Sequence, residues 1–403
     1  MFNFSRKTIV TDDKKIEELL SRGVEEIIEK DRLKEKLKSG KQLRIKLGID
    51  PTSPNIHLGR SIPILKLRDF QNLGHKIVFI IGDFTALIGD TSDKDSERPM
   101  LSIEKVKENM KSYISQAGKI LDIDLCEVEY NSKWLKEMSY DEICKQADNF
   151  SLSDFISREN IKKRLDAGKR ISLRELMYPL MQGYDSVAIK ADVELGGTDQ
   201  KFNLLSGREL QRYYGQEPQD IIMGPIIEGL DGRKMSSSWG NTINLTDSPR
   251  DMYGKVMSLH DDLIIKYFIL TTRVELSQIE IYKEALSSGK NPKEIKMKLA
   301  FELVKLYSSE MEAKKAEDYF VNTFSNKEIP EEILEIRTNR EELLRDLLVK
   351  NGVVASNAEW KRLIDGKAVY QMDPDKNIED IFFKVQETHT YRIGKKRFVR
   401  VVI

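Results

Sequence analysis

Two short apolar segments, each ending in a loop with glycine and aspartate, constrain the fold of this chain more than any other feature. They are LRIKLGID (43–50) and HKIVFIIGD (75–83), and the sequence predicts a helix between them, from about His57 to Asn72. Short segments rich in isoleucine, leucine and valine are typical of strands buried in a parallel sheet. A buried strand, a loop and a helix form the repeat of such a sheet, so we expect an α/β fold.

A second pair of strand-like segments lies further along the chain. DVELGG (192–197) leads into a predicted helix over 201–214, and residues 220–228 are again strand-like. Together the two pairs predict a doubly wound parallel sheet. Two more helices are expected from their apolar periodicity, over 12–38 and 103–121.

The rest of the chain divides by its composition. Residues 250–322 have a polar-rich helical pattern, and 323–340 carry a proline and many charges, which suits a linker. SNAE (356–359) predicts a capping box, in which Ser356 accepts from the amide of Glu359 while the Glu359 side chain reaches back. We predict a sheet domain over 1–245 with an N-terminal helix and an insertion at about 95–190, a helical domain over 246–325, a linker over 326–340 and a small α+β domain over 341–403.

The charge balance excludes a chain that is basic throughout. Lysine and arginine total 66, as do aspartate and glutamate, so any nucleic-acid-binding surface must be local. Two cysteines and four histidines show no metal-ligand spacing, which argues against a disulfide scaffold and a zinc site. No apolar run approaches the roughly 20 residues of a membrane span, and the start of the chain lacks the apolar stretch of a signal peptide. We expect a soluble cytoplasmic protein.

The loop after the first strand carries the first candidate chemistry. GIDPTSPNIHLGR (48–60) places His57 at a helix start, and Arg60 lies one turn later on the same face. A helix N-terminus with two donor or cationic side chains suits a triphosphate, although a solvated helix start with a capping histidine would have the same pattern. The motifs G-x-G-x-x-G and G-x-x-x-x-G-K-[ST] are absent, which argues against a dinucleotide dehydrogenase and a P-loop enzyme.

A second donor-rich loop follows the last predicted strand of the sheet. DGRKMSSSWGN (231–241) supplies the Lys234 ammonium group and three serine hydroxyl groups, with a glycine on each side. A mobile loop of this kind can close on a pyrophosphate as its charge develops. Taken alone, the pattern fits a flexible surface loop as well.

The two loops together resemble the paired signatures of class I aminoacyl-tRNA synthetases, here as HLG (57–59) and KMSSS (234–238). GDFTALIGD (82–90) and YPLMQGYDSVAIKADVELGGTDQKFN (178–203) resemble the tyrosyl-tRNA synthetases. SNAEWKRLIDGKAV (356–369) is similar to the S4-type RNA-binding fold of the bacterial members. The resemblance extends over nearly the whole chain.

This chain departs from the family pattern at two positions. The first motif usually ends in His or Asn, and Arg60 stands there instead. The mobile loop often carries a second lysine, and Ser237 stands there, as in active members of the wider family.

The resemblance implies a Rossmann-like catalytic domain, a helical domain on the anticodon side and an S4-like RNA-binding domain. It implies that tyrosine and ATP give tyrosyl-adenylate and pyrophosphate, and that tyrosine then passes to the terminal adenosine of tRNA(Tyr). The attacking carboxylate is already a nucleophile, so positioning and charge neutralisation can drive this step without a general base. ATP is then a substrate that brings Mg²⁺ with it, without a dedicated protein metal site, and the chain is expected to form a homodimer through the insertion.

The resemblance also assigns roles to individual residues. Those expected to act on the phosphates are His57, Arg60, Lys94, Arg98, Lys234 and Ser237. Those expected to hold ATP are Asp50, Thr52, Gly59, Gly197, Asp199, Lys234, Ser236 and Ser237. Those expected around tyrosine are Lys46, Gly48, Thr85, Asp90, Tyr178, Gln182, Asp185 and Gln200. Asp185 matches the acceptor of the phenol hydroxyl, and Lys46 stands where some relatives have a second phenol-binding tyrosine. For Lys94 and Arg98 the alternative is a solvated run of charges.

The end of the chain is locally basic, because residues 382–403 hold six basic residues against one acid, Glu387. Such an excess suits contacts with RNA phosphates, or else protects an exposed strand edge. The residues expected to contact RNA are Lys361, Arg362, Lys395, Lys396 and Arg397.

Two rival functions stay open. A tryptophanyl-tRNA synthetase shares the catalytic fold, but Asp185 in its Tyr-x-x-x-Gln-x-x-Asp setting favours tyrosine. An RNA-binding relative without catalysis would fit the unusual Arg60, but the complete set of amino-acid and ribose residues argues against it.

Overall fold

The computed structural model describes residues 9–91, 100–325, 333–372, 375–394 and 397–403. The chain forms two compact units, Met1–Lys314 and Lys315–Ile403. None of the helices within the described ranges is long and apolar enough to cross a membrane.

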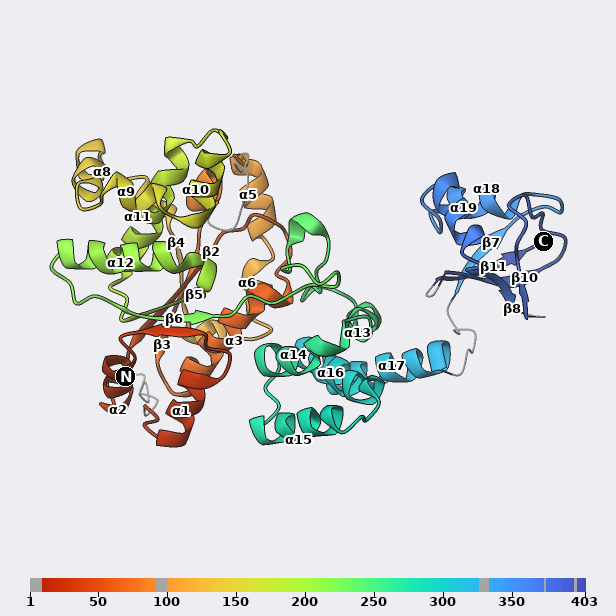
Figure 1. Ribbon diagram of the computed structural model, residues 1–403, viewed down its shortest axis with the longest axis horizontal. Coiled ribbons are helices and arrows are strands. Elements are labelled where there is room, and N and C mark those ends of the chain that lie inside the picture. Colours follow the sequence, from red (N-terminus) through yellow and green to blue (C-terminus); the bar gives the residue numbers. More distant parts are fainter. Residues whose placement is uncertain (1–8, 92–99, 326–332, 373–374, 395–396) are drawn as a thin grey trace, which may run out of the picture. The chain divides into compact units, whose positions relative to one another are not determined.

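A mainly parallel sheet lies at the centre of the first unit (Figure 1). Its six described strands follow the order β1-β6-β5-β2-β3-β4. They are β1 (Glu26–Ile28), β2 (Arg44–Ile49), β3 (Lys76–Ile81), β4 (Glu127–Tyr130), β5 (Val193–Gly197) and β6 (Asp220–Gly224). All neighbouring pairs are parallel except β1 and β6, which are antiparallel. The apolar segments predicted as buried strands therefore form the interior of this sheet.

The strand order shows that the sheet is doubly wound, as predicted. From β2 the chain passes through α3 (Leu58–Asn72) to β3 and on to β4, toward one edge. It then returns to β5, on the other side of β2, and continues through α12 (Lys201–Tyr213) to β6 in the opposite direction. Because βαβ crossovers are right-handed, these two directions place α3 and α12 on opposite faces. The direction of winding changes between β2 and β5.

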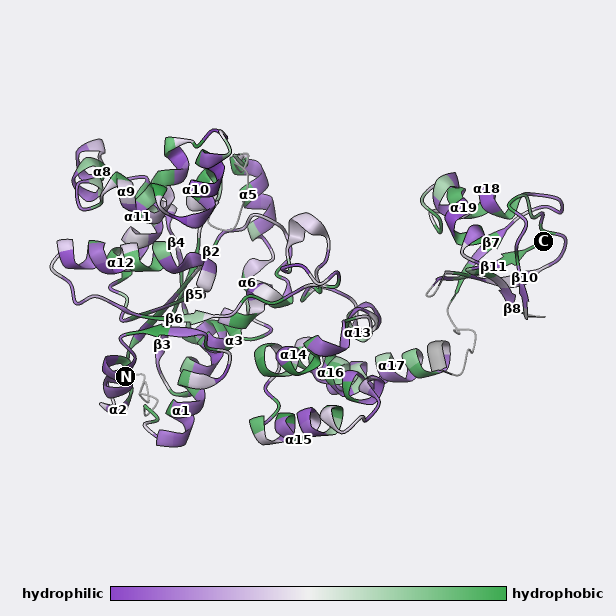
Figure 2. Ribbon diagram, viewed as in Figure 1, coloured by the Kyte–Doolittle hydropathy of each residue, from purple (hydrophilic) through white to green (hydrophobic). Residues whose placement is uncertain are grey.

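The core of the first unit consists of apolar strand residues and the inward faces of the surrounding helices. Residues 77–81 of β3 are all at most 1% exposed. Figure 2 shows the apolar strands within a shell of helices whose outer faces are largely hydrophilic. The sheet is thus covered on both faces, as a parallel sheet requires.

Helices of different lengths fill the insertion between β3 and β5, and further helices lie after β5. The insertion holds α4 (Thr85–Ile88), α5 (Ile103–Met110), α6 (Tyr113–Ala117), η1 (Ile123–Leu125), α7 (Ser132–Leu135), α8 (Tyr140–Ala147), α9 (Leu152–Ile156), α10 (Glu159–Asp166) and α11 (Leu173–Ile189). The later elements are η2 (Thr198–Gln200), η3 (Ser237–Trp239), α13 (Pro249–Met257), η4 (Asp261–Leu263), α14 (Ile264–Thr271), α15 (Leu276–Ser287), α16 (Pro292–Tyr307), α17 (Glu310–Phe320) and η5 (Val321–Ser325). The helical pattern predicted for 250–322 is confirmed.

The prediction of one helix over 12–38 is wrong. Helix α1 (Asp13–Ser21) ends before Gly23, whose φ of +61° suits glycine. Residues 26–28 then form β1 on the edge of the sheet, and α2 (Lys30–Lys38) follows. The apolar residues of 26–28 fit a helical stripe, but they belong to a strand that pairs with β6. The helical periodicity was therefore misleading here.

The helix predicted over 103–121 is interrupted in the middle. Helices α5 and α6 are separated at Ser112, whose hydroxyl group donates to the carbonyl oxygen of Pro54 at 3.1 Å. The side-chain amide of Gln116 donates to the same carbonyl at 2.9 Å. The break therefore anchors this part of the insertion to the loop that follows β2.

Helix α3 connects the sheet to the helical segment that follows it. Close to its start, Ser61 Oγ accepts a hydrogen bond from the Tyr307 hydroxyl of α16 at 3.0 Å. In its last turns, the two oxygens of Asp69 accept from Nε and Nη2 of Arg273, at 2.8 and 2.9 Å. The start of α3 is thus bonded to α16, and its end to the connection between α14 and α15.

The second unit is a small α+β structure. Its sheet, within the described residues, has the order β7-β11-β10-β8-β9. Its elements are β7 (Leu334–Arg337), α18 (Leu344–Lys350), α19 (Asn357–Asp365), β8 (Val369–Met372), β9 (Asp375–Asn377), β10 (His389–Ile393) and β11 (Arg397–Val402). The fully buried Trp360 lies in its core and donates from its indole nitrogen to the carbonyl oxygen of Ile381 at 3.0 Å.

Two details of the second unit differ from expectation. Residues 334–337, predicted as part of a linker, form the edge strand β7 and pair in parallel with β11. Ser356 accepts from the amide of Glu359 at 3.3 Å as predicted, whereas the Glu359 carboxylate accepts from the amide of Ala355 at 2.7 Å. The reciprocal half of the capping box is therefore displaced by one residue.

Candidate active site

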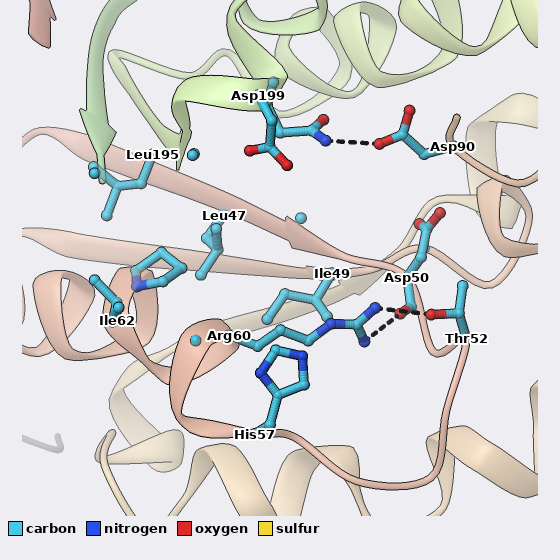
Figure 3. Close-up of a pocket in the computed structure, with 18 of the residues that line it drawn as sticks. Leu47, Ile49, Asp50, Thr52, His57, Arg60, Ile62, Asp90, Leu195 and Asp199 are labelled. Atoms are coloured by element: carbon cyan, nitrogen blue, oxygen red, sulfur yellow. Dashed lines mark hydrogen bonds between the residues drawn. The ribbon is translucent and has the colours of Figure 1, made fainter. Parts of the chain in front are cut away.

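A cavity of about 950 Å³ lies at the carboxyl ends of the parallel strands. Residues at the ends of β2, β3, β5 and β6 line it, among them Gly48, Gly82, Gly197 and Gly224. In a doubly wound sheet the loops diverge where the winding changes direction, which leaves room for a ligand at that point. Figure 3 shows the side chains that surround this space.

His57 lies in the cavity wall at the start of α3, where it is the N-cap residue. Its side chain is almost fully buried, and its Nδ1 has no hydrogen-bond partner among the described residues. Burial, aided by the charges of Arg60 and Lys234, lowers the pKa of His57 to about 3, so the imidazole is neutral at pH 7. A Cβ at Gly59 would lie 3.1 Å from His57 Nδ1, so glycine keeps the space beside the ring open.

Arg60 lies one turn after His57, and its guanidinium group binds the loop between β2 and α3 (Figure 3). Its Nη1 donates to the carbonyl oxygen of Asp50 at 3.2 Å and to the Tyr113 hydroxyl at 2.9 Å. Its Nη2 donates to Thr52 Oγ1 at 2.8 Å. The positive charge is therefore held at the cavity wall and is not directed into solvent.

The donor-rich loop 231–241 closes one side of the cavity. Lys234 Nζ lies 2.8 Å from Asp199 Oδ2, an ion pair that joins this loop to the end of β5. Ser237 Oγ lies 3.3 Å from Ser53 Oγ, which joins it to the loop after β2. The loop therefore touches both segments at the point where the winding changes direction.

The carboxyl group of Asp50 lies at the centre of a set of hydrogen bonds. Its Oδ1 accepts from Thr85 Oγ1 at 2.7 Å, and its Oδ2 accepts from the Tyr178 hydroxyl at 2.9 Å. A Cβ at Gly82 would lie 2.1 Å from Oδ1, so only glycine fits there. Burial raises the pKa of Asp50 to about 6, although both hydrogen bonds act to lower it.

A chain of side-chain amides lies beside Asp50. Gln200 Nε2 donates to Asp90 Oδ2 at 2.6 Å, a bond drawn at the top of Figure 3. Asn203 Nδ2 donates to Gln182 Oε1 at 3.1 Å and to Gln200 Oε1 at 3.0 Å. The oxygens of the two glutamines and of Asp90 make this end of the cavity rich in acceptors, which suits a cationic group of a ligand.

Asp185 also lines the cavity and is almost completely buried. Trp134 Nε1 donates to its Oδ1 at 2.8 Å, and Asn131 Nδ2 donates to its Oδ2 at 3.3 Å. Burial raises the pKa of Asp185 to about 7, against the opposing effects of the Lys46 charge and of these two hydrogen bonds. A carboxyl group held in this way can accept a hydrogen bond from a ligand.

Comparison with known proteins identifies the family of this chain. A family profile described as "tRNA synthetases class I (W and Y)" matches residues 37–325. The tyrosine–tRNA ligase of Thermotoga maritima is 45% identical over 387 residues, which cover 95% of this chain and 96% of that protein. The chain belongs to the tyrosine–tRNA ligases. The enzyme of that name from Carboxydothermus hydrogenoformans is 46% identical over 400 residues, which cover 96% and 97% of the two chains.

Solved structures of tyrosyl-tRNA synthetases share the fold. The enzyme of Archaeoglobus fulgidus complexed with L-tyrosine matches with a TM-score of 0.60 and 23% identity, over 75% of this chain and 99% of that one. A C-terminally truncated mitochondrial enzyme of Aspergillus nidulans matches with a TM-score of 0.65 and 22% identity, over 79% and 95%. At these identities the likeness concerns the fold, and it confirms the predicted α/β architecture.

The cavity of this tyrosine–tRNA ligase brings together most of the residues predicted for the site. They are Gly48, Asp50, Thr52, His57, Gly59, Arg60, Thr85, Asp90, Tyr178, Gln182, Asp185, Gly197, Asp199, Gln200, Lys234, Ser236 and Ser237. Lys46 is not among them, because its fully buried ammonium group forms an ion pair with Glu194 at 2.8 Å. Lys94 and Arg98 lie outside the described residues.

The residues expected to contact RNA lie in the second unit. Lys361 and Arg362 are exposed on α19. Arg397 donates to the Glu359 carboxylate at 2.9 Å and to the carbonyl oxygen of Val353, so it also supports the fold of the unit. Lys395 and Lys396 lie outside the described residues.

Sequence reasoning missed four residues of this ligase site. Gly82 directly follows β3, where a side chain would collide with Asp50. The Gly-Asp pair at 82–83 marks this position in the sequence. Asn203 follows Gln200 by one helical turn, so spacing alone could have linked the two. Asn131 and Trp134 lie in the insertion, where no pattern in the sequence indicates that they bind Asp185.

The described residues provide no protein metal site. No group of three or more His, Cys, Asp and Glu side chains within them is placed to hold a metal ion.

The raised pKa of Asp185 predicts a pH dependence of stability. Its folded-state pKa of about 7 lies above its unfolded value of 3.8, so the folded protein holds this proton more tightly. Between about pH 4 and 7 this group therefore lowers the unfolding free energy as pH rises, by up to about 1.4 kcal/mol per pH unit. We expect Asp185→Asn to remove this part of the slope, measured by urea denaturation from pH 4.5 to 6.5. Asp50 titrates in both proteins, and parallel stability curves would contradict the prediction.

Proposed function

We propose that this chain activates L-tyrosine with ATP and transfers it to the 3′-terminal adenosine of tRNA(Tyr). The observation that carries the proposal is one cavity with two chemically different ends. One end offers Asp185 and a group of acceptor oxygens, while the other offers His57, Arg60 and Lys234. The identity with tyrosine–tRNA ligases over nearly the whole chain supports the same reaction.

Tyrosine binds at the acceptor-rich end. Asp185, held by Trp134 and Asn131, accepts from the phenol hydroxyl group. The α-ammonium group is cationic and bears only donors, so it lies among the oxygens of Thr85, Asp90, Tyr178, Gln182 and Gln200. A Cβ at Gly48 would meet nothing within 4 Å, so the end of β2 leaves room for the ligand.

ATP binds at the end of the cavity that carries the donors. The phosphates lie near the start of α3, where His57, Gly59, Arg60 and Thr52 face the cavity. Lys234, Ser236 and Ser237 approach from the mobile loop. Gly197 and Asp199 hold the ribose, since a carboxylate suits sugar hydroxyl groups. Asp50 lies between the two ligands and binds both Thr85 and Tyr178.

The tyrosine carboxylate attacks the α-phosphorus of ATP, and pyrophosphate leaves. The work of the protein is to align the reactants and to stabilise negative charge that develops on the phosphates. His57 is neutral and donates a hydrogen bond, whereas Arg60 and Lys234 supply positive charge. Mg²⁺ arrives as part of the MgATP substrate, and no step is assigned to it because the described residues do not form a site for it. Lys94 and Arg98 belong to the proposal as further cations for pyrophosphate.

Two macromolecular partners complete the proposal. We place tRNA(Tyr) against the second unit, where Lys361, Arg362, Lys395, Lys396 and Arg397 supply positive charge, with the helical segment 246–325 on the anticodon side. We place a second copy of the chain against the insertion. The most exposed of its large apolar side chains, which support an interface there, are Met100, Ile103, Tyr140, Leu152 and Leu173.

ATP–pyrophosphate exchange tests the reaction and the amino acid together. We expect exchange with L-tyrosine and at least about a hundredfold less with L-tryptophan or L-phenylalanine, because only a phenol satisfies the acceptor at Asp185. Asp185→Ala should reduce the preference for tyrosine over phenylalanine and leave the KM for ATP unchanged. Exchange with tryptophan alone would establish the tryptophanyl reaction, and no exchange with any amino acid would support an RNA-binding protein without catalysis.

Arg60 is proposed as a permanent cation for the phosphates. Arg60→Ala should slow adenylate formation by roughly 10²–10³, the effect of losing one preorganised donor, with little change in tyrosine affinity. Single-turnover kinetics at saturating tyrosine measures this rate. Tyr113→Phe is the matched control, since it removes one hydrogen bond from Arg60 and leaves the charge in place. If both variants slow the step equally, Arg60 acts by holding the loop and not as a phosphate cation.

Removal of residues 326–403, which include the whole described sheet of the second unit, should separate the two half-reactions. The cut belongs after Ser325, because β7 pairs with β11 and a later cut would leave that strand without its partner. All residues that line the cavity lie between Gly23 and Trp239, so adenylate formation should continue. Charging of tRNA should weaken by about tenfold or more, because phosphate contacts are lost. An equal loss of both half-reactions in a folded truncation would contradict this division.

A further inference from the structure

A buried ion pair lies next to the cavity and takes no part in the reaction as proposed. Lys46 of β2 and Glu194 of β5 approach to 2.8 Å, and their side chains are 0% and 1% exposed. Removing two charges from water is costly unless each is fully paired and hydrogen-bonded.

The pair holds Gln182 at two points. Lys46 Nζ donates to the carbonyl oxygen of Gln182 at 2.8 Å, and to Ser186 Oγ at 2.7 Å. With Glu194 these acceptors use all three hydrogens of the ammonium group. Glu194 Oε1 accepts from Gln182 Nε2 at 3.3 Å, so the backbone and the side chain of Gln182 contact opposite members of the pair.

The contact with Glu194 decides how the amide of Gln182 is turned. A carboxylate only accepts hydrogen bonds, so the NH₂ group of Gln182 must face it and the oxygen must face the other way. On that side Gln182 Oε1 accepts from Asn203, and Asn203 donates equally to Gln200. The orientation set by Glu194 is thereby shared by Gln182 and Gln200, and both residues line the cavity.

We infer that the Lys46–Glu194 ion pair is a positioning device for substrate specificity: it holds the amide of Gln182 with its oxygen toward the α-ammonium group of tyrosine. This inference rests on the proposed binding of tyrosine. In the reversed orientation Gln182 would present NH₂ hydrogens to a cation, and the ammonium group would lose an acceptor. The device therefore favours an amino acid over the same molecule without its amino group.

Removing both charges of the pair should reverse the orientation of the Gln182 side-chain amide. In the variant Lys46→Met/Glu194→Gln the new amide oxygen is drawn to Ser186 and Gln219, which both donate to Glu194 Oε2. Its NH₂ group then faces Gln182, whose amide must turn over. In Glu194→Gln alone, Lys46 still requires an oxygen at the position of Oε1, so Gln182 keeps its orientation.

The experiment compares L-tyrosine with 3-(4-hydroxyphenyl)propanoate, which lacks only the ammonium group. Equilibrium binding to the full-length protein gives the ratio of the two affinities. In Lys46→Met/Glu194→Gln we expect tyrosine to bind about tenfold or more weakly, the effect of losing a hydrogen bond to a charged group, with the affinity for the propanoate unchanged. Glu194→Gln should retain the wild-type ratio in spite of its unpaired lysine. The KM for ATP should be unchanged in both variants.

A matched control separates positioning from stability. Arg164 and Glu175 form another buried pair, with side chains 2% and 0% exposed, and Glu175 also belongs to α11. Arg164→Met/Glu175→Gln should alter the melting temperature without changing the ratio. A folded Lys46→Met/Glu194→Gln variant with the wild-type ratio would overturn the inference, whereas absence of tyrosine binding by the wild-type protein would overturn the proposed function itself.

A direct measurement decides the matter where the variants do not fold. A neutron structure of the wild-type protein with L-tyrosine locates the deuterium atoms of Gln182. We expect the amide ND₂ group to face Glu194 and the oxygen to face the ammonium group. The opposite orientation would overturn the inference.

Discussion

The handedness of the crossovers between parallel strands is the constraint on which the rest of this structure depends. Because each crossover is right-handed, a chain that winds from β2 toward β4 and then from β5 toward β6 must place its helices on both faces. The loops after β2 and β5 therefore diverge, and the cavity opens between them. His57 and Asp199, far apart in the sequence, reach the same space for this reason.

Electrostatics determines which chemical groups of a ligand the cavity between these loops favours. Asp50 and Asp185 both have raised pKa values, since burial outweighs the hydrogen bonds that each receives. A ligand that brings an ammonium group and a phenol supplies donors to buried acceptors, so binding relieves part of the cost of burying them. At the other end, the Nδ1 of His57, for which the described part of the chain offers no hydrogen-bond partner, and the charges of Arg60 and Lys234 suit an anion.

Local patterns predicted much of this arrangement. Residues 43–50 and 75–83 are rich in isoleucine, leucine and valine, so their burial as strands needed no knowledge of distant partners. The spacing of His57 and Arg60 fixed their shared face in the same way. The edge strand β1 was not predictable, because its pairing with β6 depends on residues almost two hundred positions later.

The contacts around Gln182 and Asp185 depend on the tertiary fold still more. Lys46 was expected to face the ligand, and it instead pairs with Glu194 and binds Gln182, nearly 140 positions away. Trp134 approaches Asp185 from an insertion whose path no local pattern reveals. Helix α3, finally, has a mechanical consequence. Its 15 residues form a rod about 22 Å long, bonded near its start to Tyr307 and at its end to Arg273. The hydrogen bond from Tyr307 to Ser61, one turn after His57, ties the start of this rod, and with it the imidazole of His57, to helix α16.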